Sequence, residues 1–216
     1  MSYDPTYLKE TLYSGIICDV LDQMGYRKQY LSESMRPLKD DTVLLGRAFT
    51  SIGTQVYTMP ENPLTAQCKV IDQLSEGEIY VLATRGEYNC AIMGELLATA
   101  ITCKGGCGAL IDGYTRDVKR LHEMKFPLFV KGTLPCTSKG RCEVTECQVP
   151  VIIDGVTINP GDIVFGDIDG VVIIPKEIED EVFKRSLEIV LKEDSVRDNL
   201  LKGASLEDTY AKIGAI

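Results

Sequence analysis

The segment 105–117 constrains the fold of this chain more than any other. It reads Gly-Gly-Cys-Gly-Ala-Leu-Ile-Asp-Gly-Tyr-Thr-Arg-Asp. The glycines lead into a short apolar strand at 109–111, the Asp-Gly pair predicts a tight turn, and a helix is predicted to open at Thr115. Arg116 and Asp117 would then lie in the first helical turn beside a strand end. Open α/β sheets usually place ligands there, because loops and free helix N–H groups converge.

Length and charge restrict the class of protein. The chain has 216 residues, of which 44% are hydrophobic, and this is enough for a substantial core. We expect a single domain over 1–216, with N-terminal helices and a long C-terminal helix. The formal charge of -9 opposes binding to nucleic acid or to anionic membranes. No apolar run approaches the roughly 20 residues of a membrane span, and the N-terminus lacks the features of a signal peptide, so we expect a cytoplasmic protein.

The chain contains eight cysteines. They are Cys18, Cys68, Cys90, Cys103, Cys107, Cys136, Cys142 and Cys147. Without an export signal, reduced thiols are expected rather than disulfides, most of them as small buried apolar side chains. Neither the spacing of four between Cys103 and Cys107 nor the spacing of five between Cys142 and Cys147 is that of a zinc knuckle. The single His122 cannot complete a ligand set, so a structural zinc site is disfavoured.

Hydrophobic periodicity predicts the order of the elements. An apolar stripe over 7–24 indicates helix, and Ser14 and Gly15 interrupt it, which leaves one helix or two. Further helices are expected at 64–74, 93–102, 116–124 and 177–201, and strands at 43–52, 79–83 and 128–130. The strand at 43–52 carries Arg47 outward or into a cleft. Residues 132–147 are expected to form a loop.

The last third of the chain has a different pattern. Four short strands are predicted at 149–153, 156–158, 163–166 and 171–174. Their turns are the pairs Asp154-Gly155, Pro160-Gly161 and Asp169-Gly170. The chain thus has helices first, then alternating α/β units, and then a meander of hairpins. This order favours an α+β fold, specifically a layered β/β/α domain, over a plain doubly wound sheet.

Several motifs occur in an order that resembles a known family. They are Gly94-Glu95-Leu96-Leu97-Ala98, Asp112-Gly113-x-x-Arg116-Asp117, Phe126-Pro127-Leu128-Phe129-Val130-Lys131-Gly132, Gly155-Val156-x-Ile158-x-Pro160-Gly161-Asp162 and Gly166-Asp167-x-Asp169-Gly170-Val171. The chain resembles the RraA-like family, which includes the regulator of ribonuclease activity A and divalent-metal-dependent 4-hydroxy-4-methyl-2-oxoglutarate aldolases. The resemblance implies a swivelling β/β/α fold assembled as trimers or hexamers, with active sites between neighbouring subunits.

The resemblance also implies roles for individual residues. Asp117 would be the direct protein ligand of Mg²⁺ or Mn²⁺, and Arg116 would contact the pyruvoyl group of a small 2-keto acid substrate. Glu95 would hold metal-bound waters.

The segment that begins at Gly94 would bind the substrate, its carboxylate held by the backbone N–H groups of Leu96 and Leu97. Glu193, from the last long helix of a neighbouring subunit, would join the water shell, although Asp194 is adjacent and either acid fits.

The chemistry of such a site agrees with these residue types. A retro-aldol cleavage that leaves pyruvate must stabilise an enolate, and a hard divalent cation takes up its negative charge. One carboxylate with retained waters suits Mg²⁺, which dehydrates reluctantly. The chain offers no lysine in an apolar motif that we would nominate for a Schiff base, so a metal mechanism is preferred. Oxaloacetate decarboxylation passes through the same enolate and is expected as a side activity.

Each of these residues also has a purely structural interpretation. Asp117 and Glu95 could be helix-start acids that complement the helix dipole. Asp167 and Asp169 fit the geometry of a hairpin turn. The acids of the last helix fit a solvated face, and His122 fits the surface because nothing places a partner beside it.

Three functions remain open. A metal-dependent aldolase is favoured, because the chain keeps an acid at Asp117 whereas regulators of the family lack one there. The alternatives are a non-enzymatic regulator of ribonuclease activity and a family lyase that acts on a sugar-derived 2-keto acid. Residues 89–93 depart from the family pattern before Gly94, and Cys136, Cys142 and Cys147 match nothing in it. The half of the site that recognises the leaving keto acid is unassigned.

Overall fold

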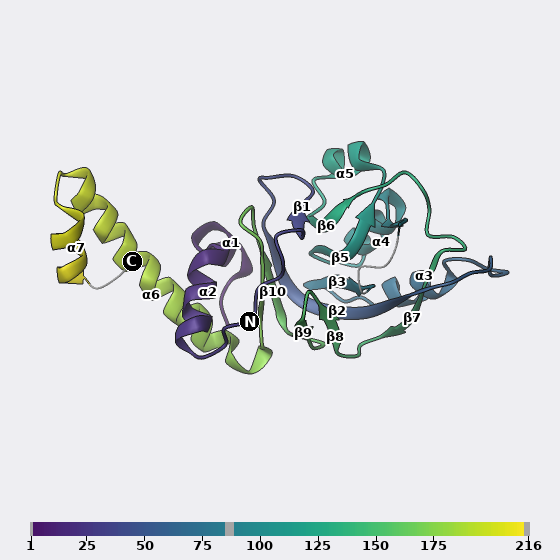
Figure 1. Ribbon diagram of the computed structural model, residues 1–216, viewed down its shortest axis with the longest axis horizontal. Helices are drawn as coiled ribbons and strands as arrows, with labels where there is room; N and C mark the ends of the chain where they lie inside the picture. The colour runs from purple at the N-terminus through teal and green to yellow at the C-terminus, as the bar shows by residue number, and fades with distance from the viewer. Residues whose placement is uncertain (1, 85–88, 214–216) are drawn as a thin grey trace.

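A curved sheet of nine strands forms the centre of the molecule (Figure 1). The structure is a computed structural model that describes residues 2–84 and 89–213. The strand order is β1-β6-β5-β3-β2-β10-β11, with β4 beside β5 and β7 beside β2. The bounds are β1 (Arg36–Pro37), β2 (Leu44–Gln55), β3 (Glu78–Ala83), β4 (Ala91–Met93), β5 (Gly108–Thr115), β6 (Leu128–Thr133), β7 (Cys142–Cys147), β10 (Ile163–Gly166) and β11 (Val171–Ile174). Strands β8 (Val151–Ile153) and β9 (Val156–Ile158) form a separate hairpin.

The middle of the sheet is parallel. Strands β2, β3, β5 and β6 run in one direction, and Leu110 of β5 pairs with Val81 on one side and Phe129 on the other. Strands β7, β10 and β11 add antiparallel neighbours at the β2 side. The carboxyl ends of the parallel strands therefore meet at one edge, where functional side chains can collect.

Helices and the β8–β9 hairpin cover the sheet in layers. The helices are α1 (Pro5–Thr11), α2 (Ser14–Gln23), α3 (Thr65–Ile71), α4 (Glu95–Cys103), α5 (Val118–Met124), α6 (Glu179–Leu201) and α7 (Leu206–Ile213). Apolar residues of α3, α4 and α5 pack on one face of β3, β5 and β6, and the β8–β9 hairpin packs on the other. Helices α1, α2 and α6 pack on β10 and β11. The α+β, β/β/α expectation is confirmed.

The predictions for the two ends of the chain agree with the structure in most respects. The first apolar stripe forms two helices, α1 and α2, which break at Leu12 and Tyr13. All four short strands of the last third are present. Asp154 and Gly155 have φ of 50° and 82°, as a type I′ hairpin turn requires. The last helix begins at Glu179, after a 3₁₀ turn at Lys176–Ile178.

The central segment was predicted incorrectly. Asp112 and Gly113 do not form a turn, because β5 continues through them to Thr115 with a bulge against β6. The Asp112 carboxylate accepts a hydrogen bond from Thr84 N at 3.0 Å instead of closing its own turn. The helix begins only at Val118, so Arg116 and Asp117 precede it.

Two strands were missed. Cys142–Cys147 is not loop but strand β7, because the long β2 offers an edge on which it pairs, with Cys147 opposite Ser51. Ala91–Met93 is strand β4, and the following helix begins at Glu95, not at Met93. Asp167 has the turn role that was expected, since its carboxylate accepts a hydrogen bond from Asp169 N at 3.0 Å. The same carboxylate also accepts hydrogen bonds from Ser14 N and Ser14 Oγ, both at 2.7 Å, which were not predicted.

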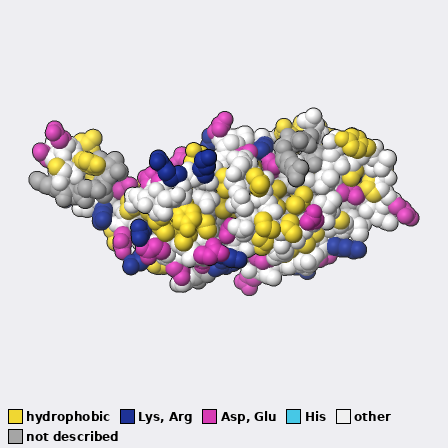
Figure 2. Space-filling model, turned by 60° about the horizontal axis from the view of Figure 1, so that its bottom comes forward, with side chains coloured by type: hydrophobic (Ala, Val, Ile, Leu, Met, Phe, Trp, Pro, Cys, Tyr) yellow, Lys and Arg dark blue, Asp and Glu magenta, His cyan; other side chains and the backbone are white. Residues whose placement is uncertain are grey.

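The surface has mixed charge on the side that carries β8 and β9. Figure 2 shows acidic and basic side chains interspersed there, around hydrophobic side chains gathered near the middle of this face. Ile152 of β8 is 61% exposed. This face therefore offers no patch of a single sign. Among the described residues, no helix combines the length and apolarity needed to cross a bilayer.

Candidate active site

Arg116 and Asp117 lie in the connection between β5 and α5. Arg116 N donates to Met93 O at 3.1 Å, and Thr115 Oγ1 donates to the same carbonyl at 3.1 Å. These bonds tie the end of β5 to the end of β4. Asp117 has φ of 61°, a left-handed conformation that few residue types other than glycine and the Asx pair adopt readily. The backbone thus turns the Asp117 side chain back toward β4.

Gly94 gives the Asp117 carboxylate the space it occupies. A Cβ on Gly94 would lie 2.6 Å from Asp117 Oδ2, closer than real Cβ atoms approach another atom. Glu95 N donates to the same oxygen at 3.2 Å, and Arg116 Nε lies 3.7 Å from it. The Arg116 and Asp117 side chains are each 42% exposed. Asp117 is therefore held by the backbone at the start of α4 and still faces solvent.

The first turn of α4 begins beside this carboxylate and carries backbone donors that the helix does not use. Ala98 N is the first amide of the helix to bond within it, to Gly94 O at 3.1 Å. The N–H groups of Leu96 and Leu97 precede it and have no partner inside the helix. The Glu95 carboxylate accepts a hydrogen bond from Thr99 Oγ1 at 3.2 Å. The structure thus brings the predicted residues 94–97 and 116–117 together.

Two hollows meet at the Arg116 and Asp117 side chains. The first, of about 220 Å³, lies toward α4 and is lined by Gly94, Leu97 and Ser138 among others. The second, of about 270 Å³, lies on the other side. The charged pair therefore lies between two spaces, each large enough for a few carbon atoms.

Glu193 is not part of this site within one chain. It lies on α6, which extends away from the sheet on the side opposite α4 and α5 (Figure 1). The Tyr13 hydroxyl donates a short hydrogen bond to the Glu193 carboxylate. Burial of the phenol and this bond to Glu193 raise the pKa of Tyr13. A role for Glu193 at Asp117 therefore requires a second copy of the chain.

The donor chemistry fits a hard divalent cation. The described residues contain no cluster of three or more His, Cys, Asp or Glu side chains that could hold a metal. A cation at Asp117 would therefore take most of its ligands from water and substrate. Mg²⁺ and Mn²⁺ accept such oxygen-rich, largely aqueous coordination.

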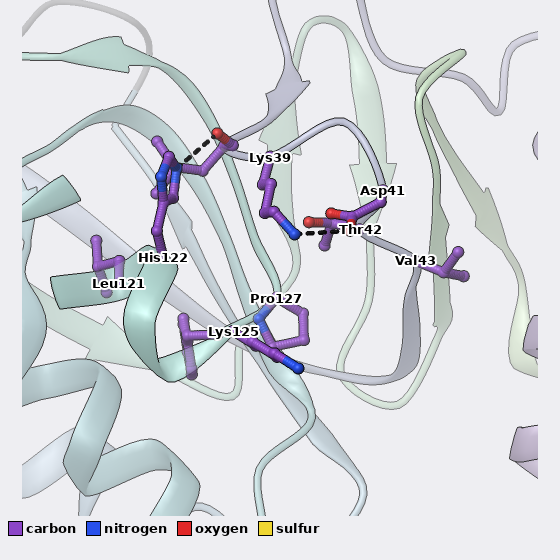
Figure 3. A pocket seen from close by; sticks show the side chains of 10 residues that line it. Lys39, Asp41, Thr42, Val43, Leu121, His122, Lys125 and Pro127 are labelled. Carbon is purple, nitrogen blue, oxygen red and sulfur yellow. Dashed lines mark hydrogen bonds and ion pairs between the residues drawn. The ribbon is translucent and has the colours of Figure 1, made fainter. Parts of the chain in front are cut away.

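His122 lies outside this site. Its Nε2 is 3.2 Å from Leu38 O, and it lines a separate hollow of about 290 Å³ with Lys39 and Lys125 (Figure 3). Lys39 Nζ lies 2.6 Å from Asp41 Oδ2 across that hollow. His122 is exposed on α5, in agreement with its predicted surface position.

The cysteines agree only in part with their predicted role. All eight are free thiols. Cys90 and Cys142 are buried, whereas Cys68 and Cys103 are exposed and the other four lie in between. The expectation that most thiols are buried was wrong, because Cys68 lies on an exposed position of α3 and Cys103 on an exposed position at the end of α4. Cys136 lies beside β4, where Ala91 N donates to its carbonyl at 2.9 Å.

A buried ion cluster was missed at the sequence level. Lys131 Nζ lies 2.6 Å from Asp112 Oδ1 and 2.9 Å from Asp154 Oδ1, at a cavity of about 550 Å³. Burial alone would lower the pKa of Lys131, but the two carboxylates outweigh it and raise that pKa. A lysine that stays protonated is a poor imine nucleophile. The choice of a metal mechanism over a Schiff base is consistent with this.

Comparison with known proteins places the chain in a family. Residues 15–173 match the family model described as "RraA-like: Aldolase/RraA", which covers more than half of the chain. The chain belongs to the RraA-like family. A protein of Halalkalibacterium halodurans named "Putative 4-hydroxy-4-methyl-2-oxoglutarate aldolase" is 28% identical over 195 residues, which are 88% of each chain.

Two further proteins are similar to most of this chain. Protein DlpA of Legionella pneumophila is 32% identical over 197 residues, and the match spans 90% of this chain but 31% of that protein. The crystal structure of RraAS2 from Streptomyces coelicolor, described as an unusual member of the RNase ES inhibitor RraA protein family, has a TM-score of 0.79 at 27% identity. That similarity covers 90% of this chain and 96% of the other.

Proposed function

We propose that this protein is a divalent-metal-dependent aldolase that cleaves 4-hydroxy-4-methyl-2-oxoglutarate or a related 4-hydroxy-2-keto acid. The products are pyruvate and a second keto acid. The observation that carries the proposal is the Asp117 carboxylate, held by Glu95 N and beside Arg116 at the entrance to two hollows. We expect oxaloacetate decarboxylation as a side activity, because it forms the same enolate.

The reaction breaks the bond between the third and fourth carbons of the substrate. The proton of the C4 hydroxyl leaves to water, C4 becomes a carbonyl carbon, and the electron pair of the broken bond stays on C3 as the pyruvate enolate. Protonation of C3 then gives pyruvate. A divalent cation, when bound, supplies Lewis-acid stabilisation of the negative charge that develops on the keto oxygen.

The residues of this chain bind and orient the substrate. The N–H groups of Leu96 and Leu97 would bind its carboxylate, because the amino end of α4 carries unpaired donors and partial positive charge. The Arg116 guanidinium would hold the pyruvoyl oxygens from a second side. Asp117 would hold the cation directly, and Glu95 would order its waters.

We also propose that the active protein is a homo-oligomer of single-domain chains, a trimer or hexamer. Glu193 of a neighbouring subunit would complete the water shell of each site. The support is that α6 carries Glu193 away from its own Arg116 and Asp117 (Figure 1).

A panel of 2-keto acids tests the proposal. Purified protein is incubated with each acid, with and without Mg²⁺ or Mn²⁺, and released pyruvate is measured. We expect pyruvate only when the metal is present. If no acid yields pyruvate under any metal condition, the proposal is rejected.

A negative result would favour the second candidate, a non-enzymatic regulator of a ribonuclease. This candidate is supported by the similarity to RraAS2, which is described as a member of an RNase inhibitor family.

Substitution of the proposed metal ligand gives the sharpest test. Asp117→Asn should lower metal-dependent turnover at least about a thousandfold, since electrostatic stabilisation by a metal is worth several kcal/mol. The side chain is half exposed, so the fold and the assembly should not change. Turnover, circular dichroism and light scattering are measured on the same samples. Undiminished turnover in this variant would remove Asp117 from the mechanism.

A further inference from the structure

Strand β4 is irregular directly before the candidate active site. Ala91 of β4 pairs with Tyr114 of β5. The next pair joins Met93 and Thr115, so β4 advances by two positions while β5 advances by one. Ile92 is therefore the extra residue of a β-bulge. A bulge bends its strand and changes the direction in which the following residues point, and bulges are frequent beside functional sites for this reason.

This bulge sets the course of the chain into the site. The Met93 carbonyl accepts hydrogen bonds from Arg116 N and Thr115 Oγ1, both at 3.1 Å. Gly94 follows directly, and a Cβ there would lie 2.6 Å from Asp117 Oδ2. A shift of β4 against β5 would therefore change both the bond to Arg116 and the space that the Asp117 carboxylate occupies.

A buried side chain of α3 holds the bulge. Gln67 Nε2 donates to Ile92 O at 3.1 Å, and Gln67 is only 2% exposed. Val70 and Ile71 of the same helix pack in the apolar cluster that contains Ile92. The donor thus comes from a helix that is itself packed against β4. Because the bond is buried within one chain, it does not depend on a neighbouring subunit.

The bond explains why a polar residue lies at this position. An amide in a protein interior lowers stability unless it is hydrogen-bonded, whereas an apolar side chain of similar size has no such requirement. The extra residue of a bulge is left out of the regular ladder, so its backbone groups need partners from elsewhere. Gln67 supplies one of these partners to Ile92.

We propose that Gln67 is a positioning residue for the candidate active site. Its amide fixes the bulge at Ile92, and the bulge in turn fixes the distance between Gly94 and the pair Arg116 and Asp117. Gln67 does not touch the substrate or the metal in this account and acts only through β4. The inference rests on the proposed aldolase function and adds a residue that no motif of the site contains.

Hydrogen exchange on the metal-free protein tests this positioning without turnover. Gln67→Met removes the donor and keeps a side chain of similar length. Peptides that cover 91–97 and 114–118 should exchange at least about threefold faster in this variant, because the bond from Arg116 N to Met93 O opens more often. A peptide from 163–174, in β10 and β11, should exchange at the wild-type rate if the fold is intact. Unchanged exchange in both site peptides would overturn the inference.

Metal affinity and kinetics give a second readout, which a role in stability alone would not change. Well below the unfolding temperature, the Kd for Mg²⁺ should rise and kcat/KM should fall about tenfold in Gln67→Met, since groups that orient a metal ligand affect both. Gln73→Met is the matched control, because Gln73 Nε2 also donates to a backbone carbonyl, Lys69 O at 2.9 Å, but at an exposed position. This control should keep the wild-type values. If Gln67→Met differs from it only in melting temperature, the inference is wrong.

A second variant covers the case in which Gln67→Met does not fold. Gln67→Asn keeps the amide but is one methylene shorter, so it withdraws the donor from Ile92 O. The same exchange and Mg²⁺ measurements apply, and wild-type behaviour of this variant would equally overturn the inference.

These measurements separate the inference from the function on which it rests. If the wild-type protein releases no pyruvate from any 2-keto acid, the aldolase function is rejected, and faster exchange with weaker Mg²⁺ binding in the Gln67 variants still supports the positioning role. If the wild-type protein is an active aldolase and the Gln67 variants match the Gln73 control, only the positioning role is rejected.

Discussion

At the scale of single residues, Gly94 contributes to the site because it has no side chain. Its missing side chain leaves room for the Asp117 carboxylate, since a Cβ would lie 2.6 Å from Asp117 Oδ2. The Gly-Glu-Leu-Leu motif and the Arg-Asp motif therefore form one site. They are in direct contact, since Glu95 N donates to Asp117 although 22 positions separate the two residues.

Gly94→Ala should therefore reduce activity through Asp117. The new methyl group must displace the carboxylate, so we expect a fall in Mg²⁺ affinity and in turnover of about ten- to a hundredfold. Metal titration and kinetics measure the two effects.

Gly15→Ala is the matched control, because a Cβ on Gly15 meets only the Tyr13 ring at 3.5 Å, an ordinary contact. Alanine there, inside α2, should leave activity unchanged and stabilise the fold slightly. Equal activity of the two variants would contradict this account of Gly94.

At the scale of elements, Lys131 joins the sheet to the β8–β9 hairpin. Its ammonium group lies between Asp112 of β5 and Asp154 of the hairpin turn. Asp154 Oδ2 also accepts hydrogen bonds from Ser32 N at 3.1 Å and Ser32 Oγ at 2.8 Å. Burial alone would raise the pKa of Asp154, but the bonds from Lys131 and Ser32 outweigh it and lower that pKa.

The lowered pKa of Asp154 gives a pH-dependent stability. A carboxyl group whose pKa is lower in the folded state stabilises the protein above its unfolded pKa, near 4, and loses this effect as the pH falls through the folded value. Asp154→Asn should thus lower the free energy of unfolding by about 1–3 kcal/mol at pH 6 and by much less near pH 3. Urea titrations across this range measure the difference. Asp41→Asn, which removes an exposed pair with Lys39, is the control and should change little. A pH-independent effect of Asp154→Asn would exclude the proposed linkage.

A second ion pair fixes the start of α6. Arg47 donates to Glu179 through both terminal nitrogens, at 2.9 and 2.7 Å, so this side chain pairs with the start of α6. Glu179→Gln should lower stability by about 1–3 kcal/mol, because it weakens a charge-assisted bidentate pair. Thermal unfolding measures the change. Glu181→Gln, which removes an exposed pair with Arg185 on the same helix, should have little effect. Comparable losses of stability in both variants would show that the Arg47–Glu179 pair contributes no more than an exposed ion pair.

The sequence allowed prediction of elements whose signals are local. Turn pairs such as Asp154-Gly155 were predicted because backbone conformation is encoded within a few residues. The interruption at Ser14 and Gly15 left one helix or two open, and the structure has two, with the break at Leu12 and Tyr13. The same local reasoning failed at Asp112-Gly113, where β5 continues as a bulge between its pairings with β6 at Ile111 and Tyr114. It also failed for β7, which depends on the distant edge of β2.

The site was predictable only to the extent that motifs encode it. Arg116, Asp117 and residues 94–97 were expected together, and the structure brings them together. The Lys131 ion cluster follows from strand register, which no motif specifies. The predicted partnership of Asp117 with Glu193 cannot be examined within one chain.

At the scale of the whole molecule, α6 places Glu193 far from the other predicted site residues. It runs from the β10–β11 side of the fold outward and ends in α7, on the far side from α4 and α5 (Figure 1). Leu191 and Leu201 on it are 72% and 81% exposed. Exposed leucines on a projecting helix are consistent with the contact between subunits that we propose.

Mixing two inactive variants tests whether Glu193 acts in a neighbouring site. Asp117→Asn and Glu193→Gln chains are co-expressed. Mixed assemblies should recover part of the wild-type turnover, because the intact Asp117 of one chain meets the intact Glu193 of another. Light scattering should show assemblies of at least three times the 23.8 kDa chain mass. Recovery no greater than the sum of the separate variants would place Glu193 outside the site of its neighbour.

The outward course of α6 has a consequence for how the protein behaves in a cell. If each active site includes an acidic residue of a neighbouring subunit, a correctly folded monomer has no activity. Specific activity should then decline on dilution, once the chains begin to dissociate, and the abundance of the protein would itself set how much of it can work.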